Sequence, residues 1–95
     1  MGEIIRKHLR FRGWVQGVGF RYRARHAAGL TGATGWVRNE ADGSVVMELQ
    51  GTQVQIDRVI QMIGNGRYVQ IDSIDAQTVP ADPDERGFTV RGDRC

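Results

Sequence analysis

The segment from Gly13 to Arg21, with the sequence GWVQGVGFR, has residue types suited to binding an anion. Its glycines allow positive φ angles, with which successive backbone N–H groups turn toward one point. A helix is expected to follow from Phe20 without a Ser, Thr, Asp or Asn cap, so its first N–H groups lack a local acceptor. A phosphate would satisfy them, and Arg21 would grip it bidentately. The other interpretation of such a loop is a plain turn.

A second candidate is Asn39, which ends a predicted strand just before the turn Glu40-Ala41-Asp42-Gly43. An asparagine at such a position is commonly a turn residue. Its side-chain amide is also suited to orienting a bound water molecule. The residues by themselves leave both interpretations open.

The residue sets used by most other catalysts are not evident in the chain. Cys95 is the single cysteine and the last residue, while His8 and His26 stand far apart in the sequence. Ser44 and Ser73 have no evident His–Asp partners, and no GxxxxGK[ST] loop is present. We therefore expect a site that uses neither a metal ion nor an organic cofactor.

Charge is distributed unevenly along the chain, although the net charge is only +2. No Asp or Glu occurs between Ile4 and Asn39, a stretch that holds many basic residues. These are Arg6, Lys7, Arg10, Arg12, Arg21, Arg23, Arg25 and Arg38. A basic half favours an anionic partner such as phosphate, nucleic acid or an acidic surface. The alternative is a solvated basic face without a partner.

Alternation and helical periodicity predict seven elements. In chain order they are a strand at 8–12, a helix from 20 to 28, strands at 34–39 and 44–50, a helix from 52 to 63, an extended segment at 69–79 and a strand at 88–90. Gly29 and Gly32 are expected to end the first helix, and Asp42-Gly43 favours a hairpin.

Two further signals concern the second half of the chain. Thr52 with Gln55 three residues later predicts a capping box at the start of the second helix. The alternation slips between Ile71 and Ile74, which indicates a β-bulge.

The predicted order is β-α-β-β-α-β with a short final strand. Right-handed crossovers would place both helices on one face of a single antiparallel sheet. The predicted fold class is therefore α+β, a ferredoxin-like sandwich. A length of 95 residues suits one domain spanning residues 1–95.

Two segments of the chain resemble the acylphosphatase family. The signature G-x-V-Q-G-V-x-[FM]-R is matched from Gly13 to Arg21. A second signature, G-aromatic-small-x-N-x-x-x-G-x-V with a glycine six places later, is matched from Gly35 to Gly51. The resemblance covers residues 7 to 51 strongly and the rest weakly, and the family's fold agrees with the predicted one.

The resemblance implies an enzyme that hydrolyses acyl phosphates to a carboxylate and inorganic phosphate. Arg21 and Asn39 would be the catalytic residues, with Asn39 orienting the attacking water. The phosphate group would be held by Arg21 and by the loop that precedes it: Gln16, Gly17, Val18, Gly19 and Phe20.

Two alternatives stay open. One is an RNA-binding module, because a basic ferredoxin-like sandwich also describes the RRM; the segment Val45–Leu49, however, has no aromatic residue to stack bases. The other is a non-catalytic phosphate-binding or protein-contact domain, like the one in hydrogenase-maturation carbamoyltransferases.

The chain has no run near the ~20 apolar residues of a membrane helix and no apolar segment at its N-terminus. We expect a cytoplasmic monomer without a nucleic-acid or membrane partner.

Overall fold

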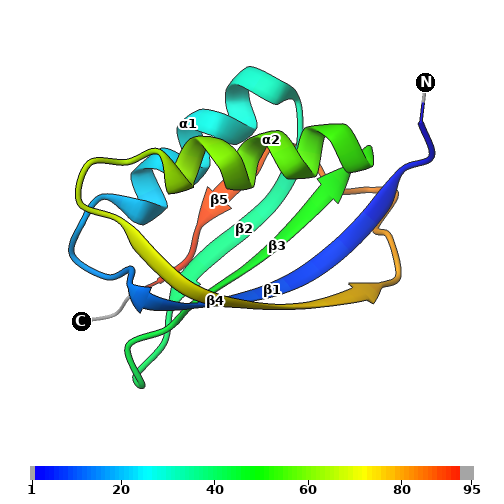
Figure 1. Cartoon of the computed structure of the whole chain (residues 1–95). Helices are drawn as coiled ribbons and strands as arrows, with labels where there is room; N and C mark the ends of the chain where they lie inside the picture. Colours follow the sequence, from blue (N-terminus) through cyan, green and yellow to red (C-terminus); the bar gives the residue numbers. More distant parts are fainter. Residues whose placement is uncertain (1, 93–95) are drawn as a thin grey trace.

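The computed structural model describes residues 2–92, which form a five-stranded sheet with two helices on one face (Figure 1). This confirms the predicted ferredoxin-like arrangement. In chain order the elements are β1 (Ile5–Trp14), α1 (Phe20–Thr31), β2 (Thr34–Asn39), β3 (Val45–Gly51), α2 (Gln53–Gly64), β4 (Gln70–Val79) and β5 (Phe88–Val90).

The strands lie in the order β4-β1-β3-β2-β5. The first four are antiparallel neighbours, but β5 pairs with β2 in parallel. The prediction of an antiparallel sheet is therefore wrong at this edge, and the sheet is mixed. The reason is the crossing of residues 80–87 from the β4 edge to the β2 edge, which reverses the chain relative to β4 and aligns β5 with β2. Residue alternation does not encode that direction.

Two elements, β1 and α1, differ from the expected boundaries by more than one residue. β1 continues through Gly13 and Trp14, because its partner β4 extends as far. Gly29 lies inside α1, while Gly32 alone caps the helix, donating its backbone N–H to the Ala28 carbonyl at 2.9 Å. Neither helix of the described part is long and apolar enough to cross a membrane.

Two other expectations are confirmed. Thr52 and Gln55 form the capping box of α2, with Gln55 N–H donating to Thr52 Oγ1 at 3.2 Å. The bulge is at Asp72, because Arg12 pairs with Ser73 while the next residue of β1 pairs with Ile71.

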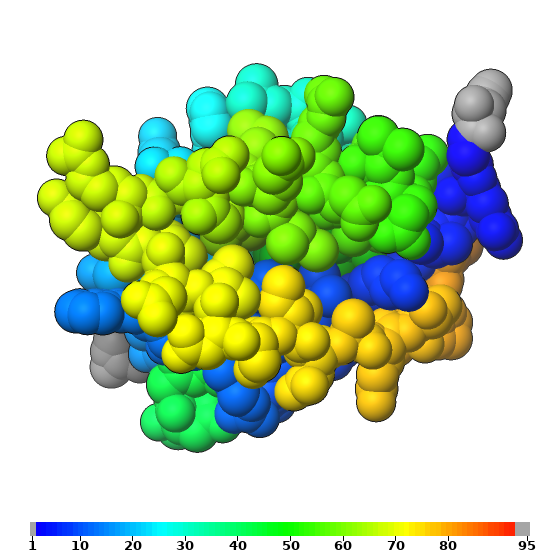
Figure 2. Space-filling model, viewed as in Figure 1, coloured from blue at the N-terminus to red at the C-terminus, as the bar shows by residue number. Residues whose placement is uncertain are grey.

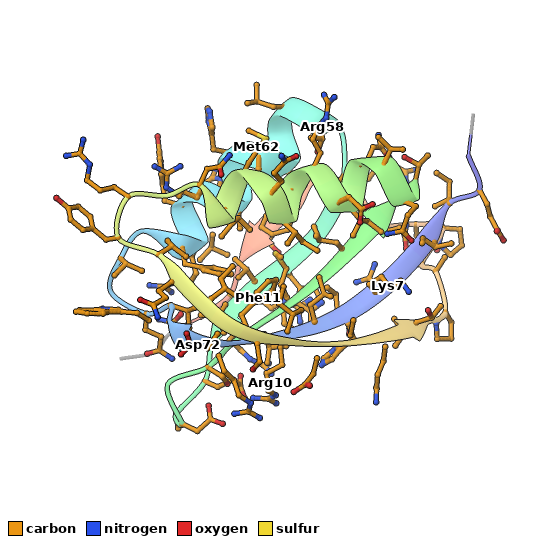
Figure 3. All side chains as sticks on the ribbon, viewed as in Figure 1. Lys7, Arg10, Phe11, Arg58, Met62 and Asp72 are labelled. Atoms are coloured by element: carbon orange, nitrogen blue, oxygen red, sulfur yellow. The ribbon has the colours of Figure 1, made fainter. Side chains whose placement is uncertain are left out.

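Apolar side chains fill the space between the sheet and the helices. Phe11 lies on this side of β1, whereas Arg10 lies on the opposite side (Figure 3). On the face seen in Figure 2, residues of α2 and of the edge strand β4 form most of the visible surface. The buried cluster includes Leu9, Phe11, Phe20, Ala24, Ala27, Val37, Val45, Met47, Leu49, Ile56, Val59 and Ile63.

The opposite face of the sheet carries a charged network centred on Arg6, which is only 6% exposed. Its guanidinium donates hydrogen bonds to Glu48 at 2.7 Å and to Glu85 at 2.8 and 3.1 Å. A further bond goes to Gln50 at 3.1 Å. Glu48 also accepts from His8 Nδ1 at 2.6 Å. Because the contacts span β1, β3 and the segment before β5, the network fixes that crossing segment to the sheet.

Substitution of two glycines tests the packing. Gly35→Ala should lower the free energy of unfolding by about 2 kcal/mol or more, because a Cβ there would collide with the Glu48 carbonyl at a φ of 144°. Gly29→Ala should raise it by up to about 1 kcal/mol, because Gly29 is helical and a Cβ meets open space. Urea denaturation measures both; equal effects of the two changes would contradict the close approach of β2 to β3.

The charged network also predicts a pH dependence. Burial would raise the pKa of Glu48, but the hydrogen bonds from His8 and Arg6 outweigh it and hold that pKa below its usual value. Ionised Glu48 therefore stabilises the fold above the unfolded-state pKa of about 4.3, and this contribution is lost as the pH falls through the lower folded value. Glu48→Gln should flatten the fall in unfolding free energy below about pH 5, measured by urea titration, whereas Glu3→Gln at an exposed position should not.

Candidate functional site

The loop between β1 and α1 has the backbone geometry of an anion-binding nest. Gly17 and Gly19 have φ angles of 74° and 83°, in the left-handed region. Gln16 and Val18 have negative φ, since no residue other than glycine is positive. This alternation in sign turns successive N–H groups toward a common side. The space around Gly17 and Gly19 is open, so it is the φ angle that requires glycine there.

The first turn of α1 has the missing cap that the sequence predicts. Gly19 is the N-cap residue, and no side chain accepts a hydrogen bond from the turn. Within residues 2–92, no backbone carbonyl outside the regular elements accepts from the N–H groups of residues 17–20. These donors therefore remain available to an anion, which the helix dipole also favours.

The side chain of Gln16 joins this loop to the β2–β3 hairpin. Its amide nitrogen donates two hydrogen bonds, to the Glu40 carbonyl at 2.7 Å and to the Ser44 carbonyl at 2.9 Å. These carbonyls stand at the two ends of the hairpin turn, where Glu40 N–H also donates to Ser44 O at 2.9 Å. One side chain thus fixes the loop against the residues that directly follow Asn39.

Asn39, the last residue of β2, is half-buried and lies on the face of the sheet that the helices cover. Side chains alternate along a strand, and Val37, two residues earlier, is fully buried in the core. Asn39 also pairs with Val45, another core residue. Its side chain makes no hydrogen bond within the part of the chain that the structure describes. The Asn39 side chain therefore does not hydrogen-bond to the turn residues that follow it.

The core positions the start of α1 near this strand end. The rings of Phe11 and Phe20 meet edge to face, with centroids 4.9 Å apart. Phe11 pairs with Val45, which pairs with Asn39, so the three lie in one row across the sheet. Arg21 follows Phe20 as the second residue of α1 and is half-buried. The end of β1, the loop and the hairpin lie at the same end of the molecule (Figure 1).

Arginines of β1 contact the hairpin. Ser44 donates to Asp42 through its hydroxyl at 2.6 Å and its backbone N–H at 2.9 Å, and these bonds, with the charges of Arg10 and Arg12, lower the pKa of Asp42. The guanidinium of Arg10 donates to Ser44 Oγ at 2.7 Å, and Arg12 lies 3.5 Å from Asp42. Arg10 and Arg12 thus contact the hairpin. Arg38 forms an ion pair with Glu40, with 2.7 Å between Arg38 Nε and Glu40 Oε2.

Sequence reasoning assigned Gln16 to the phosphate loop but missed the contact of its side chain with the hairpin. No local pattern shows it, because the partners are backbone carbonyls 24 and 28 residues away. Among residues 2–92, no three His, Cys, Asp or Glu side chains are arranged to hold a metal ion.

Comparison with known proteins finds acylphosphatases among both the sequence relatives and the solved structures. The profile of the Acylphosphatase family matches residues 7–90. An acylphosphatase from Bifidobacterium longum is 38% identical over 91 residues, covering 94% of both chains. One from Salinibacter ruber is 39% identical over 91 residues, covering 95% of this chain and 96% of its own. The crystal structure of the acylphosphatase from Bacillus subtilis has a TM-score of 0.84 at 25% identity, covering 93% of this chain and 99% of its own.

Replacement of Gln16 tests its contact with the hairpin. Gln16→Glu places a carboxylate against two carbonyl oxygens and should lower the free energy of unfolding by about 1–3 kcal/mol. Gln61→Glu, at an exposed position of α2, introduces the same charge and serves as the control. Urea denaturation measures both, and equal stability of the two variants would show that the loop and the hairpin do not depend on this side chain.

Proposed function

Because the chain belongs to the acylphosphatase family, we propose that it hydrolyses acyl phosphates to a carboxylate and inorganic phosphate. The observation that carries this proposal is the pair of Gln16 hydrogen bonds, which fix the glycine nest against the strand end that bears Asn39. An anion-binding loop and a half-buried amide thus belong to one end of the fold.

The nest and the start of α1 bind the phosphate group in this proposal. The N–H groups of residues 17–20 donate to its oxygens, and the dipole of α1 adds a favourable field. Arg21 neutralises charge that builds up on the phosphoryl oxygens as the reaction proceeds. Gln16 contributes its backbone to the loop and its side chain to holding the hairpin.

Asn39 orients the attacking water. Its amide offers both a donor and an acceptor, which are the groups needed to hold a water molecule in one orientation. The water oxygen forms a bond to phosphorus while the bond from phosphorus to the acyl oxygen breaks on the opposite side. The electron pair of the broken bond leaves with the carboxylate, and the proton of the water passes to a phosphate oxygen.

The chemistry of the leaving group explains why so few residues suffice. A carboxylic acid has a pKa near ~4, so the carboxylate leaves as an anion without needing a proton. No general acid is then required, and catalysis depends on placing the water and stabilising charge. Backbone amides, one arginine and one asparagine supply these functions.

The RNA-binding alternative would need aromatic rings that can stack bases. Trp14 is 68% exposed, whereas Trp36 is 8% exposed and lies beside the guanidinium groups of Arg38 and Arg91, at 5.2 and 4.5 Å. Nothing in the described residues favours a second function, and the monomeric state and cytoplasmic location stay predictions.

Substitution of the two proposed catalytic residues separates their roles. Arg21→Ala should abolish both phosphate binding and turnover. Asn39→Ala should lower kcat about 10²–10³-fold while phosphate still inhibits competitively, because only the orientation of the water is lost. Benzoyl phosphate hydrolysis without added metal, in the presence and absence of inorganic phosphate, measures kcat and the competitive inhibition.

The control for this experiment is Arg25→Ala, which removes the same charge from an exposed position of α1. It should retain wild-type kinetics. An Asn39→Ala enzyme with raised KM and unchanged kcat would contradict the role in orienting water.

A further inference from the structure

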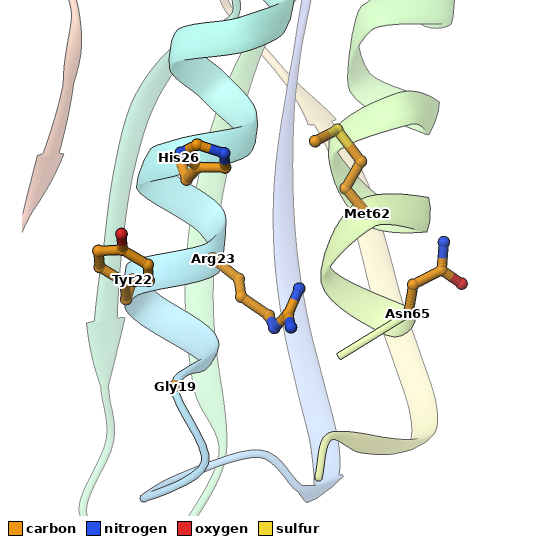
Figure 4. A pocket seen from close by; sticks show the side chains of 6 residues that line it. All are labelled: Gly19, Tyr22, Arg23, His26, Met62 and Asn65. Atoms are coloured by element: carbon orange, nitrogen blue, oxygen red, sulfur yellow. The ribbon is translucent and has the colours of Figure 1, made fainter. Parts of the chain in front are cut away.

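A groove runs between α1 and α2 on the outer side of the helix layer and begins at the proposed phosphate-binding loop. Its volume is about 400 Å³, within the range of small-molecule sites. In Figure 4 Arg23 extends from α1 and Met62 from α2 into the space between the helices, while the rings of Tyr22 and His26 lie against α1 itself. The lining residues are Gly19, Tyr22, Arg23, His26, Met62 and Asn65.

The α1 wall of the groove presents flat, polarisable groups. Tyr22, Arg23 and His26 follow Gly19 at intervals of three, four and seven residues, so they share one face of the helix. The rings of Tyr22 and His26 are stacked, with 9° between their planes and centroids 6.3 Å apart.

Arg23 links the two walls. A Cβ added to Gly66, in the turn after α2, would come within 2.6 Å of Arg23 Nε and 2.8 Å of its Cδ. The Arg23 side chain therefore reaches from α1 to this turn. Its guanidinium plane is suited to stacking against an aromatic group. Met62, on the opposite wall, adds a thioether that favours aromatic contacts and adapts to their shape.

The groove meets the proposed phosphate-binding loop at Gly19. This glycine is both a residue of the anion-binding nest and a lining residue of the groove. In an in-line displacement the leaving group lies opposite the attacking water. If Asn39 holds the water, the acyl group lies on the side of the phosphate away from Asn39, and the groove opens beside the nest at Gly19.

We propose that this groove is the acyl-group subsite and that it selects acyl phosphates with a planar, aromatic acyl group. This inference rests on the proposed function. An aromatic ring would contact Tyr22, Met62 and Arg23, whereas the single methyl of an acetyl group leaves most of these contacts unmade.

The test compares kcat/KM for benzoyl phosphate and acetyl phosphate in the same variants. Tyr22→Ala removes one wall and should lower the benzoyl-to-acetyl ratio about threefold to tenfold. Asn65→Trp fills the groove and should lower that ratio as well, with acetyl phosphate hydrolysis retained. Both positions are exposed, so the fold should tolerate the changes, which urea denaturation verifies. The control is Tyr68→Ala, which removes an equally exposed tyrosine (69% against 73%) outside the groove.

The outcomes are distinct. A reduced ratio in Tyr22→Ala and Asn65→Trp, with Tyr68→Ala unchanged, supports the subsite. Hydrolysis of both substrates with an unchanged ratio in all three variants overturns the subsite and leaves the proposed function intact. Failure of the wild-type enzyme to hydrolyse either substrate overturns the proposed function, and the subsite with it.

Discussion

Two hydrogen bonds from one side chain hold the candidate site together. The Gln16 amide contacts the carbonyls at both ends of the β2–β3 turn, so the glycine loop cannot move independently of the hairpin. Asn39 precedes that turn, and the nest follows Gln16. An in-line reaction requires its water and its phosphate to be fixed relative to each other, and small displacements are costly in rate. The contact therefore matters for positioning, although Gln16 touches no reacting atom through its side chain in the proposed mechanism.

The core provides the rigid support for this contact. Phe11 and Phe20 pack edge to face, and Phe11, Val45 and Asn39 occupy one row across three strands. Strand spacing and ring packing leave little freedom in such a row. The loop itself has no regular structure, yet it is held at one end by β1 and at the other by α1. A site that relies on backbone donors benefits from this arrangement, because its donors need not reorganise during the reaction.

The uneven distribution of charge along the sequence is explained in part by ion pairs within the fold rather than by the binding of an anionic partner. Arg6 pairs with Glu48 and Glu85, which lie far away in the sequence and stabilise the crossing segment before β5. Other basic residues of β1 are engaged by the hairpin. Arg6, Arg10 and Arg12 are thus paired with carboxylates of β3, of the β2–β3 hairpin and of the segment before β5. The imbalance suggested an anionic partner, but for these arginines the partners are carboxylates of the same chain.

The order of elements, the capless helix start, the bulge and the capping box were predictable from the sequence, because each depends on neighbouring residues. The family and the candidate residues Arg21 and Asn39 were also predictable, because each of the two signatures is a single short stretch of the sequence. Four features were not predictable from the sequence: the parallel pairing of β5, the ion pairs of Arg6, the hydrogen bonds from Gln16 to the hairpin and the groove between α1 and α2. These features join residues that are distant in the chain, and only the packing of the whole fold decides which distant groups meet.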